Sequence, residues 1–235
     1  MEATAVKTRY LLVAVLVPAV LVQDRLAPLD TLPATATAAL AASLDAARSH
    51  ATHVWRDHAP LNSDGTVNAY VEIARGDRRK WEFDMRANAR AIDRMMPDGL
   101  EYPVAYGFVP QTVSYDGDPF DALVLGPAVP AGQLVRGVIV GLMVMEDEKG
   151  LDSKVVLAAV DGKGRPVQEL SAGDRQRIGD YFMRYKAHEP GKFSRVPGWE
   201  SSAQGLAHVT TTHAFFLECR ERGAVACRVG EVSRD

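Results

Sequence analysis

The stretch Ser114–Gly126 reads "SYDGDPFDALVLG" and places three carboxylates directly before an apolar run. Asp116, Asp118 and Asp121 fall within six positions, and the run Ala122–Leu125 that follows them is typical of a buried strand. Like charges this close repel one another, and burying them without partners is strongly unfavourable. The repulsion must therefore be offset by bulk water or by a cation.

The same residues admit other interpretations. Asp116-Gly117-Asp118-Pro119 is a plausible turn, so a solvated loop remains open. A calcium loop of the EF-hand type is excluded. With Asp116 at its first position, Asp121 stands where glycine is required, and Pro127 stands where a bidentate glutamate is required. A divalent-metal site and a solvated turn are the two remaining candidates.

Composition sets limits on the class of protein. The chain has 235 residues, of which 47% are hydrophobic and 24% charged, as in an ordinary globular protein with one substantial core. A net charge of −3 provides no basic surface for nucleic acid. Two cysteines, Cys219 and Cys227, exclude a thiolate zinc cluster and a disulfide-dense scaffold.

The N-terminal residues 1–25 have the pattern of a signal peptide. Lys7 and Arg9 precede the uncharged apolar run Tyr10–Val22, which is shorter than the roughly 20 residues that span a membrane. We therefore expect a periplasmic or secreted protein, with an uncleaved segment and a cytoplasmic location as the alternative. In an oxidising compartment, Cys219 and Cys227 could pair.

Periodicity divides the rest of the chain into two parts. Residues 26–62 are expected to form a linker with a short alanine-rich helix near Thr37–Arg48, and residues 63–235 the main domain. Alternating or branched apolar runs predict strands over 67–73, 80–84, 134–145 and 154–160. Helical patterns follow, one opening at Ser171 and one spanning about Ser202 to Arg222. The order indicates an α+β, mainly β fold: a small closed barrel with helices packed outside.

A second acidic cluster lies between two predicted strands, in Met145–Lys154. It offers Glu146, Asp147, Glu148 and Asp152 as oxygen donors. Two acidic clusters beside buried strands are better explained by a shared metal site than by two solvated turns, and Glu72 and Glu82 are either exposed or further ligands. Oxygen donors without a Cys or His cluster favour Mg²⁺, or Mn²⁺, over zinc. Nearby cations and phenols suit a metal-bridged phosphate: Lys80, Arg94, Tyr102, Tyr106, Lys154, Tyr185 and Lys186.

The segment "YPVAYGFVPQTVSYDGDPFDALVL" closely resembles the family I soluble inorganic pyrophosphatases, whose signature is D-x-D-P-x-D. Further matches follow the family's order: "VEI", "KWEFD", "DR", "EDEKGLDSK", "YK", "GKF" and "GWE". The resemblance covers about His53 to Arg222. It implies a five-stranded, OB-like barrel with flanking helices and Mg²⁺-dependent hydrolysis of pyrophosphate to two phosphates. It also implies a homo-oligomer, commonly a hexamer in bacteria.

The resemblance also implies roles for particular residues. Asp116, Asp121 and Asp152 would hold the two metals that activate water, with Asp118 as the base. Glu72, Asp147 and Asp152 would serve metals that arrive with substrate, and Glu82 would act through water. The catalytic group would include Tyr106 and Arg94 beside Asp118. Pyrophosphate would be gripped by Lys80, Arg94, Tyr106, Lys154, Tyr185 and Lys186, with Tyr102 in support.

Two alternatives remain beside the hydrolase. One is an exported module that binds metal or phosphate without catalysis, although no expected ligand is replaced by an apolar residue. The other is a phosphohydrolase of organic diphosphates, although no aromatic platform for a base is apparent. The sequence departs from the family's pattern at Ala74 and Ala105, and neither position is an expected metal ligand.

Overall fold

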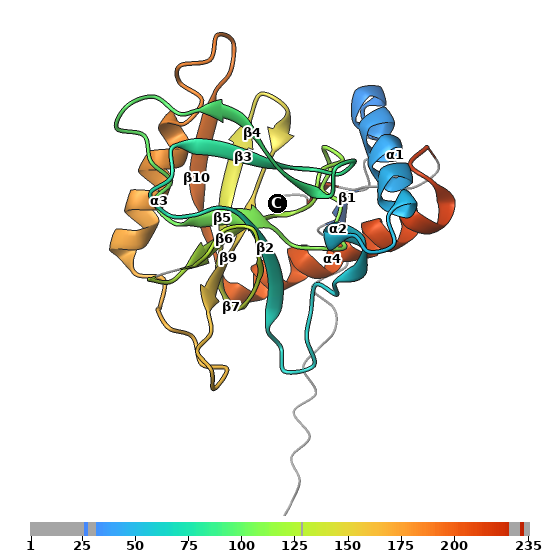
Figure 1. Cartoon of the computed structure of the whole chain (residues 1–235). Coiled ribbons are helices and arrows are strands. Elements are labelled where there is room, and N and C mark those ends of the chain that lie inside the picture. The colour runs from blue at the N-terminus through green and yellow to red at the C-terminus, as the bar shows by residue number, and fades with distance from the viewer. Residues whose placement is uncertain (1–25, 28–31, 128, 226–230, 233–235) are drawn as a thin grey trace, which may run out of the picture.

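The computed structural model describes residues 26–27, 32–127, 129–225 and 231–232 (Figure 1). The predicted signal peptide and Cys227, the possible partner of Cys219, lie outside these residues. Within them, no helix is both long and apolar enough to cross a membrane.

Strands account for most of the regular elements. They are β1 (Leu26–Ala27), β2 (Val67–Ile73), β3 (Arg79–Asp84), β4 (Ala89–Met95), β5 (Ala105–Phe108), β6 (Asp121–Leu125), β7 (Leu134–Asp147), β8 (Gly150–Leu151), β9 (Lys154–Ala159), β10 (Ser194–Glu200) and β11 (Glu231–Val232). The helices are α1 (Ala34–Ser49), α2 (Val54–Asp57), α3 (Ala172–Arg184) and α4 (Ser202–Arg222).

Five strands close into a ring through hydrogen bonds, in the order β7, β2, β5, β6, β9 and back to β7. Only the β6–β9 pair in this ring is parallel. The long strand β7 pairs with β2, β9 and β10, and its register against β9 shifts between Ile139 and Gly141. Such a shift bends a strand and increases its twist, which helps a small sheet to close. The expected closed arrangement of five strands, mainly β with flanking helices, is confirmed.

Strands β2 and β5 approach so closely that one position requires glycine. A side-chain carbon built on Gly107 would lie 1.8 Å from the carbonyl oxygen of Tyr70. No side chain fits at that distance, so Gly107 permits the pairing that places Tyr106 next to the ring's interior.

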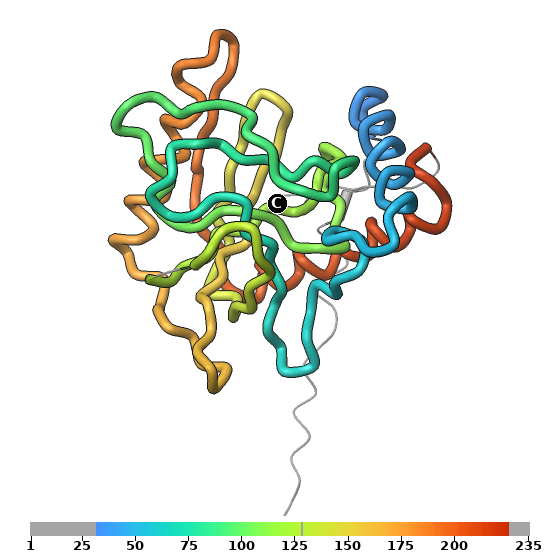
Figure 2. The backbone as a smooth tube through the Cα atoms, viewed as in Figure 1, coloured from blue at the N-terminus to red at the C-terminus, as the bar shows by residue number. Residues whose placement is uncertain are grey.

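The strand over residues 80–84 does not join the ring. It forms β3, which pairs with β4 in a separate two-stranded sheet that crosses beside the ring (Figure 2). Strand β4 was not predicted from the sequence, because its apolar and polar residues do not alternate regularly and its side chains are mostly exposed. Because the β3–β4 hairpin lies beside the ring, its charged side chains can face the same space as the charged side chains of the ring strands.

Helix α3 begins at its N-cap Ser171, the residue that the sequence predicts. The Ser171 hydroxyl accepts a hydrogen bond from the Asp174 amide, and the Asp174 carboxylate accepts one from the Ser171 amide. Ser201 caps α4 in a similar way, and Gly223 ends that helix with a φ of +82°. On α4, Val209 and Phe216 are buried, whereas Leu206 is 44% exposed.

The predicted alanine-rich helix near Thr37–Arg48 corresponds to α1. Its Leu40 and Leu44 are buried in one hydrophobic cluster with Trp55 and Phe216. Residues 34–57 therefore pack on α4 and on the main domain (Figure 1). The boundary at residues 62 and 63 remains a prediction.

Candidate active site

A cavity of about 690 Å³ opens between the β3–β4 hairpin and one end of the ring. Thirteen of the fourteen residues with a predicted role in the site line this cavity: Glu72, Lys80, Glu82, Arg94, Tyr102, Tyr106, Asp116, Asp118, Asp121, Asp147, Asp152, Tyr185 and Lys186. The exception is Lys154, which is buried. Residues up to 114 positions apart in the chain, Glu72 and Lys186, thus share one space.

The acidic loop, residues 114–120, connects β5 to β6. The Ser114 amide donates to the Asp118 carbonyl at 2.7 Å, and the Asp118 amide donates to an Asp116 carboxylate oxygen at 3.1 Å. Burial, followed by repulsion from Asp118, raises the pKa of Asp116 to about 6. Burial likewise raises the pKa of Asp118, although the Lys149 ammonium opposes the shift. The loop holds two carboxylates together against their mutual repulsion.

Lys154 lies between two carboxylates at the start of β9. Its Nζ donates to Asp121 at 2.5 Å and to Asp152 at 2.8 Å, and the residue is only 1% exposed. Burial lowers the pKa of Lys154, but the two carboxylates outweigh it and the net shift is upward. Burial also raises the pKa of Asp152 to about 7, because one ammonium shared by two carboxylates does not neutralise both.

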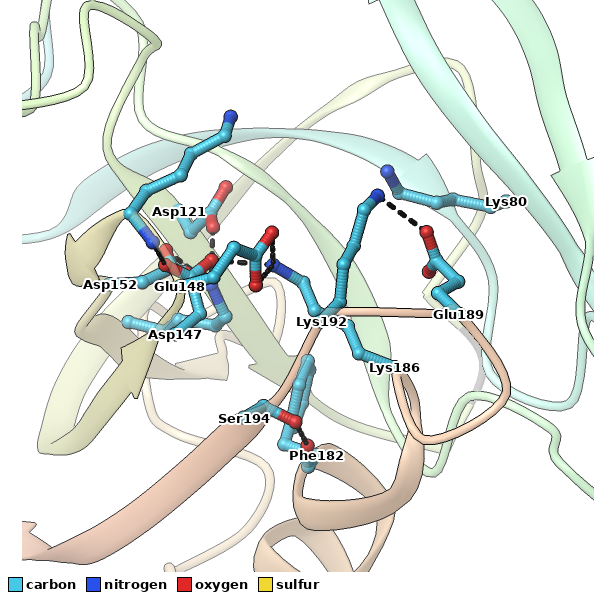
Figure 3. Close-up of polar contacts among 12 residues, drawn as sticks. Lys80, Asp121, Asp147, Glu148, Asp152, Phe182, Lys186, Glu189, Lys192 and Ser194 are labelled. Carbon is cyan, nitrogen blue, oxygen red and sulfur yellow. Dashed lines mark hydrogen bonds and ion pairs between the residues drawn. The ribbon is translucent and has the colours of Figure 1, made fainter.

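A second ammonium stands at the end of α3. The Nζ of Lys186 donates to Asp147 at 2.5 Å and to both carboxylate oxygens of Glu148 at 3.2 Å (Figure 3). Asp147 ends strand β7, so the contact ties the turn after β7 to the segment after α3. Two lysines thus hold the acidic turn that joins β7 to β9.

The hairpin contributes the opposite wall. A carboxylate oxygen of Glu72 accepts a hydrogen bond from the Phe83 amide at 2.7 Å, and burial raises the pKa of Glu72 well above its usual value. Lys80 forms ion pairs with Glu82 and Asp93. These pairs leave Glu82 at the mouth, since its side chain is 57% exposed.

Arg94 links the hairpin to the segment after α3. Its guanidinium contacts Asp93 at 2.5 Å and Glu189 at 2.7 Å, and Glu189 in turn contacts Lys192 at 2.5 Å. Figure 3 shows Lys80 and Lys192 reaching into the cavity from different segments, and both line it. The mouth therefore presents three cations, Lys80, Arg94 and Lys192, in a chain of ion pairs with carboxylates.

The phenols at the base of the cavity are kept protonated. Burial is the main cause that raises the pKa of Tyr106 and of Tyr185, and the nearby carboxylates Asp121 and Asp152 raise both further. Their hydroxyl groups can accordingly donate hydrogen bonds to an anion at neutral pH. The pKa of Tyr102 is raised too, first by burial and then by Tyr181.

The donor set fits hard divalent cations. The acidic groups that line the cavity offer carboxylate oxygens without cysteine, which Mg²⁺ and Mn²⁺ prefer. Among the described residues, no three such side chains are arranged as they stand to hold a metal ion. The ammonium groups of Lys154 and Lys186 contact four of the carboxylates. The buried carboxylates with raised pKa values nevertheless need positive charge beyond those two lysines.

A family model of known proteins, described as inorganic pyrophosphatase, matches residues 69–216, which is more than half of the chain. The chain belongs to the inorganic pyrophosphatase family. The match contains every one of the site residues named above. It confirms the family resemblance that the sequence motifs indicate.

Similar proteins agree with this membership. An inorganic pyrophosphatase of Gluconobacter oxydans is 39% identical over 146 residues, covering 59% of this chain and 84% of the relative. One of Thermus thermophilus is 40% identical over 151 residues, covering 61% and 86%. By structural comparison, a crystal structure of the enzyme from Thermus thermophilus has a TM-score of 0.65 at 32% identity, covering 71% of this chain and 99% of that chain. One from Coxiella burnetii has a TM-score of 0.63 at 36% identity, covering 68% and 99%.

Six further charged residues of this inorganic pyrophosphatase line the cavity beside the predicted site residues: Asp84, Arg86, Asp93, Glu148, Lys149 and Lys192. The family motifs contain five of them. Asp84 belongs to "KWEFD", Asp93 to "DR", Glu148 and Lys149 to "EDEKGLDSK", and Lys192 to "GKF". Arg86 lies outside the motifs, in the turn between β3 and β4.

Proposed function

We propose that the cavity binds inorganic pyrophosphate with Mg²⁺ and hydrolyses it to two phosphate ions. Family membership supports this reaction. The observation that carries it is the facing arrangement of the two walls: buried carboxylates line the ring's end, and lysines and Arg94 line the mouth. A polyanion is attracted directly to the wall of lysines and Arg94. It is attracted to the wall of carboxylates only when metal cations bridge the two sets of negative charge.

The carboxylates would hold the metal ions. Asp116, Asp121 and Asp152 form the inner set, Glu72 and Asp147 would hold ions that enter with the substrate, and Glu82 would act through water. When bound, the ions supply a water of lowered pKa and neutralise charge on the phosphates. The lysines that now contact Asp121, Asp152 and Asp147 would be freed to contact phosphate oxygens as metal replaces them.

Three residues would carry the chemistry itself. A carboxylate oxygen of Asp118 accepts a proton from the attacking water, and the raised pKa of Asp118 brings it nearer to neutral pH, as a general base requires. The protonated hydroxyl of Tyr106 and the guanidinium of Arg94 donate to phosphate oxygens as charge builds on the leaving phosphate. Lys80, Lys154, Tyr185 and Lys186 complete the grip, and Tyr102 packs beneath Tyr106 with ring centroids 5.6 Å apart.

The test is phosphate release from pyrophosphate, from a nucleoside diphosphate and from an organic diphosphate, each with Mg²⁺ and with chelator. We expect release from pyrophosphate alone, its loss in chelator and its restoration by Mg²⁺, with inhibition by Ca²⁺ because that larger ion tolerates looser geometry. Equal turnover of the organic diphosphate would favour the broader phosphohydrolase. Binding of pyrophosphate without turnover would favour the non-catalytic module.

Assembly and location belong to the same proposal. A homo-oligomer, a hexamer by family resemblance, is expected, and analytical ultracentrifugation of the purified protein measures it. Export is inferred from the basic and apolar pattern of residues 1–25. N-terminal sequencing of the protein from its own cell tests export, and a mature chain that begins at Met1 in the cytosol would contradict it.

A further inference from the structure

Among the described residues other than glycine, two have a positive φ: Asn88 at 50° and Gln111 at 51°. This left-handed conformation is unfavourable for most residues and persists where surrounding contacts impose it. Both residues contact the same short segment, residues 52–56, which precedes the family-matched residues 69–216.

Asn88 anchors the turn between β3 and β4. Its side-chain oxygen accepts a hydrogen bond from the Val54 amide at 3.1 Å, and its side-chain nitrogen donates to the Thr52 carbonyl at 3.0 Å. The rings of His50 and His53 add hydrogen bonds to two carbonyls of the same turn, those of Arg86 at 2.7 Å and Met85 at 3.0 Å. Four contacts thus fix a turn whose residues 84–86 line the cavity.

Gln111 anchors the segment that leads into the acidic loop. Its amide donates to the Trp55 carbonyl at 2.8 Å, and its side chain donates to the Arg56 carbonyl at 2.6 Å. The indole of Trp55, which is fully buried, donates to the Thr112 carbonyl at 2.9 Å. The Thr112 hydroxyl accepts from the Phe120 amide at 2.8 Å and so closes the base of the acidic loop.

Helix α1 touches the tip of the same loop. Gly117 lies between Asp116 and Asp118 with a φ of +90°, and a side-chain carbon built there would lie 3.0 Å from the carbonyl oxygen of Ala36. Nearly two turns further along the helix, Ala42 and Ser43 form part of the cavity wall. Residues 34–57 therefore hold the acidic loop at both its tip and its base.

We propose that residues 34–57 are a positioning element of the active site, in which Trp55 and its hydrogen bond to Thr112 fix the acidic loop in its metal-binding form. The inference rests on the proposed function, because it assigns Asp116 and Asp118 to the metal and the attacking water. Two carboxylates that repel one another would otherwise separate, and the free loop would have to be reordered at each binding event. Fixing the loop removes that ordering cost from metal binding.

The test is the substitution Trp55→Phe, which keeps an aromatic ring against Phe216 and removes the indole donor to Thr112 together with the volume of one ring. Calorimetric titration with MgCl₂, without pyrophosphate, should show an affinity for Mg²⁺ that is weaker by about 3- to 10-fold. The Mg²⁺ concentration for half-maximal hydrolysis should rise by the same factor, while kcat at saturating Mg²⁺ stays within about twofold of wild type.

A matched control separates positioning from a general loss of stability. Asp174→Ala removes the carboxylate of the capping box at the N-terminal end of α3, does not alter the cavity lining, and should lower the melting temperature without changing Mg²⁺ affinity. Asn88→Gly is the second variant, since glycine accepts a φ of 50° and only the two side-chain hydrogen bonds are lost. It should raise KM for pyrophosphate by several-fold, because the hairpin carries Lys80 and Arg94.

The outcomes distinguish the two proposals. A wild-type protein without pyrophosphate hydrolysis would overturn the proposed function. An active wild type together with a folded Trp55→Phe variant of unchanged Mg²⁺ affinity would overturn the positioning role. If Trp55→Phe does not fold, the Asn88→Gly variant tests the positioning role in its place. A KM for pyrophosphate equal to that of wild type in Asn88→Gly would contradict the role of residues 34–57.

Discussion

Asp118 sits between two proposed metal ligands and precedes a proline, which restricts its backbone toward extended conformations. We expect Asp118→Asn to lower kcat by about 10²–10⁴ at saturating Mg²⁺, because the shape is kept and the proton acceptor is lost. The variant should also gain more from rising pH than wild type does, as hydroxide replaces the missing base. Measurement of kcat against pH and Mg²⁺ checks this.

Asp116→Asn is the matched variant on the other side of Gly117. It should weaken metal binding, so that excess Mg²⁺ restores part of its activity, whereas excess Mg²⁺ should not restore Asp118→Asn. If Asp118 merely caps the turn, asparagine would cap it equally well. Activity of Asp118→Asn within a few-fold of wild type would then remove Asp118 from catalysis.

At the scale of one element, the cap of α3 depends on an ionised carboxylate. Burial raises the pKa of Asp174, but hydrogen bonds from Ser171 and Arg177 outweigh it and lower the pKa to about 2. Asp174→Ala should therefore reduce the free energy of unfolding by about 1–2 kcal/mol at pH 7. The folded-state pKa lies below the unfolded value near 3.8, so this contribution is complete above pH 4 and declines as pH falls toward 2. Urea denaturation of both proteins at pH 7 and pH 3 measures the two differences, and equal differences would contradict the carboxylate's role.

The close packing of helix α4 on strand β7 depends on Gly205. A side-chain carbon on Gly205 would lie 2.8 Å from a methyl carbon of Ile139 and 3.1 Å from the carbonyl oxygen of Gly141. Gly205→Ala should therefore destabilise the protein by about 1–3 kcal/mol through overpacking. The control is Gly173→Ala in the exposed first turn of α3, where the nearest atom is 3.8 Å away and helix propensity favours alanine. Thermal denaturation compares them, and a Gly205→Ala protein as stable as wild type would show that α4 can shift away from the sheet.

For the whole molecule, the cavity's uncompensated carboxylates link metal binding to stability. Burial keeps the pKa of Asp116 at about 6 and that of Asp152 at about 7, so metal ions should stabilise the folded state. Mg²⁺ at about 100 times its dissociation constant should add about 2.7 kcal/mol and raise Tm by about 5–10 °C. Calorimetry at constant ionic strength, with NaCl in place of MgCl₂ as control, measures the shift. No shift in wild type, or an equal shift in Asp116→Asn, would contradict the assignment of Asp116 to the metal.

Local chemistry made much of this protein predictable from its sequence. Ser171 and Gly223 mark helix ends because caps act within a single turn, and Asp116, Asp118 and Asp121 act together because they are neighbours in the chain. The order of the motifs was enough to indicate the family and the closed five-stranded arrangement.

Contacts between distant segments were decided only by the tertiary structure. The mostly exposed strand β4 pairs with β3 because ladder hydrogen bonds do not depend on a regular alternation of apolar residues. Lys154 stands between Asp121 and Asp152 because the parallel pairing of β6 with β9 brings their starts together. Residues 34–57 close one side of the site although their composition suggested a linker, because burial of Leu40 and Leu44 needs a surface that only the folded domain provides. The spacing of residues along a chain specifies which side chains share one face of a helix or strand. It does not specify which distant part of the chain packs against that face.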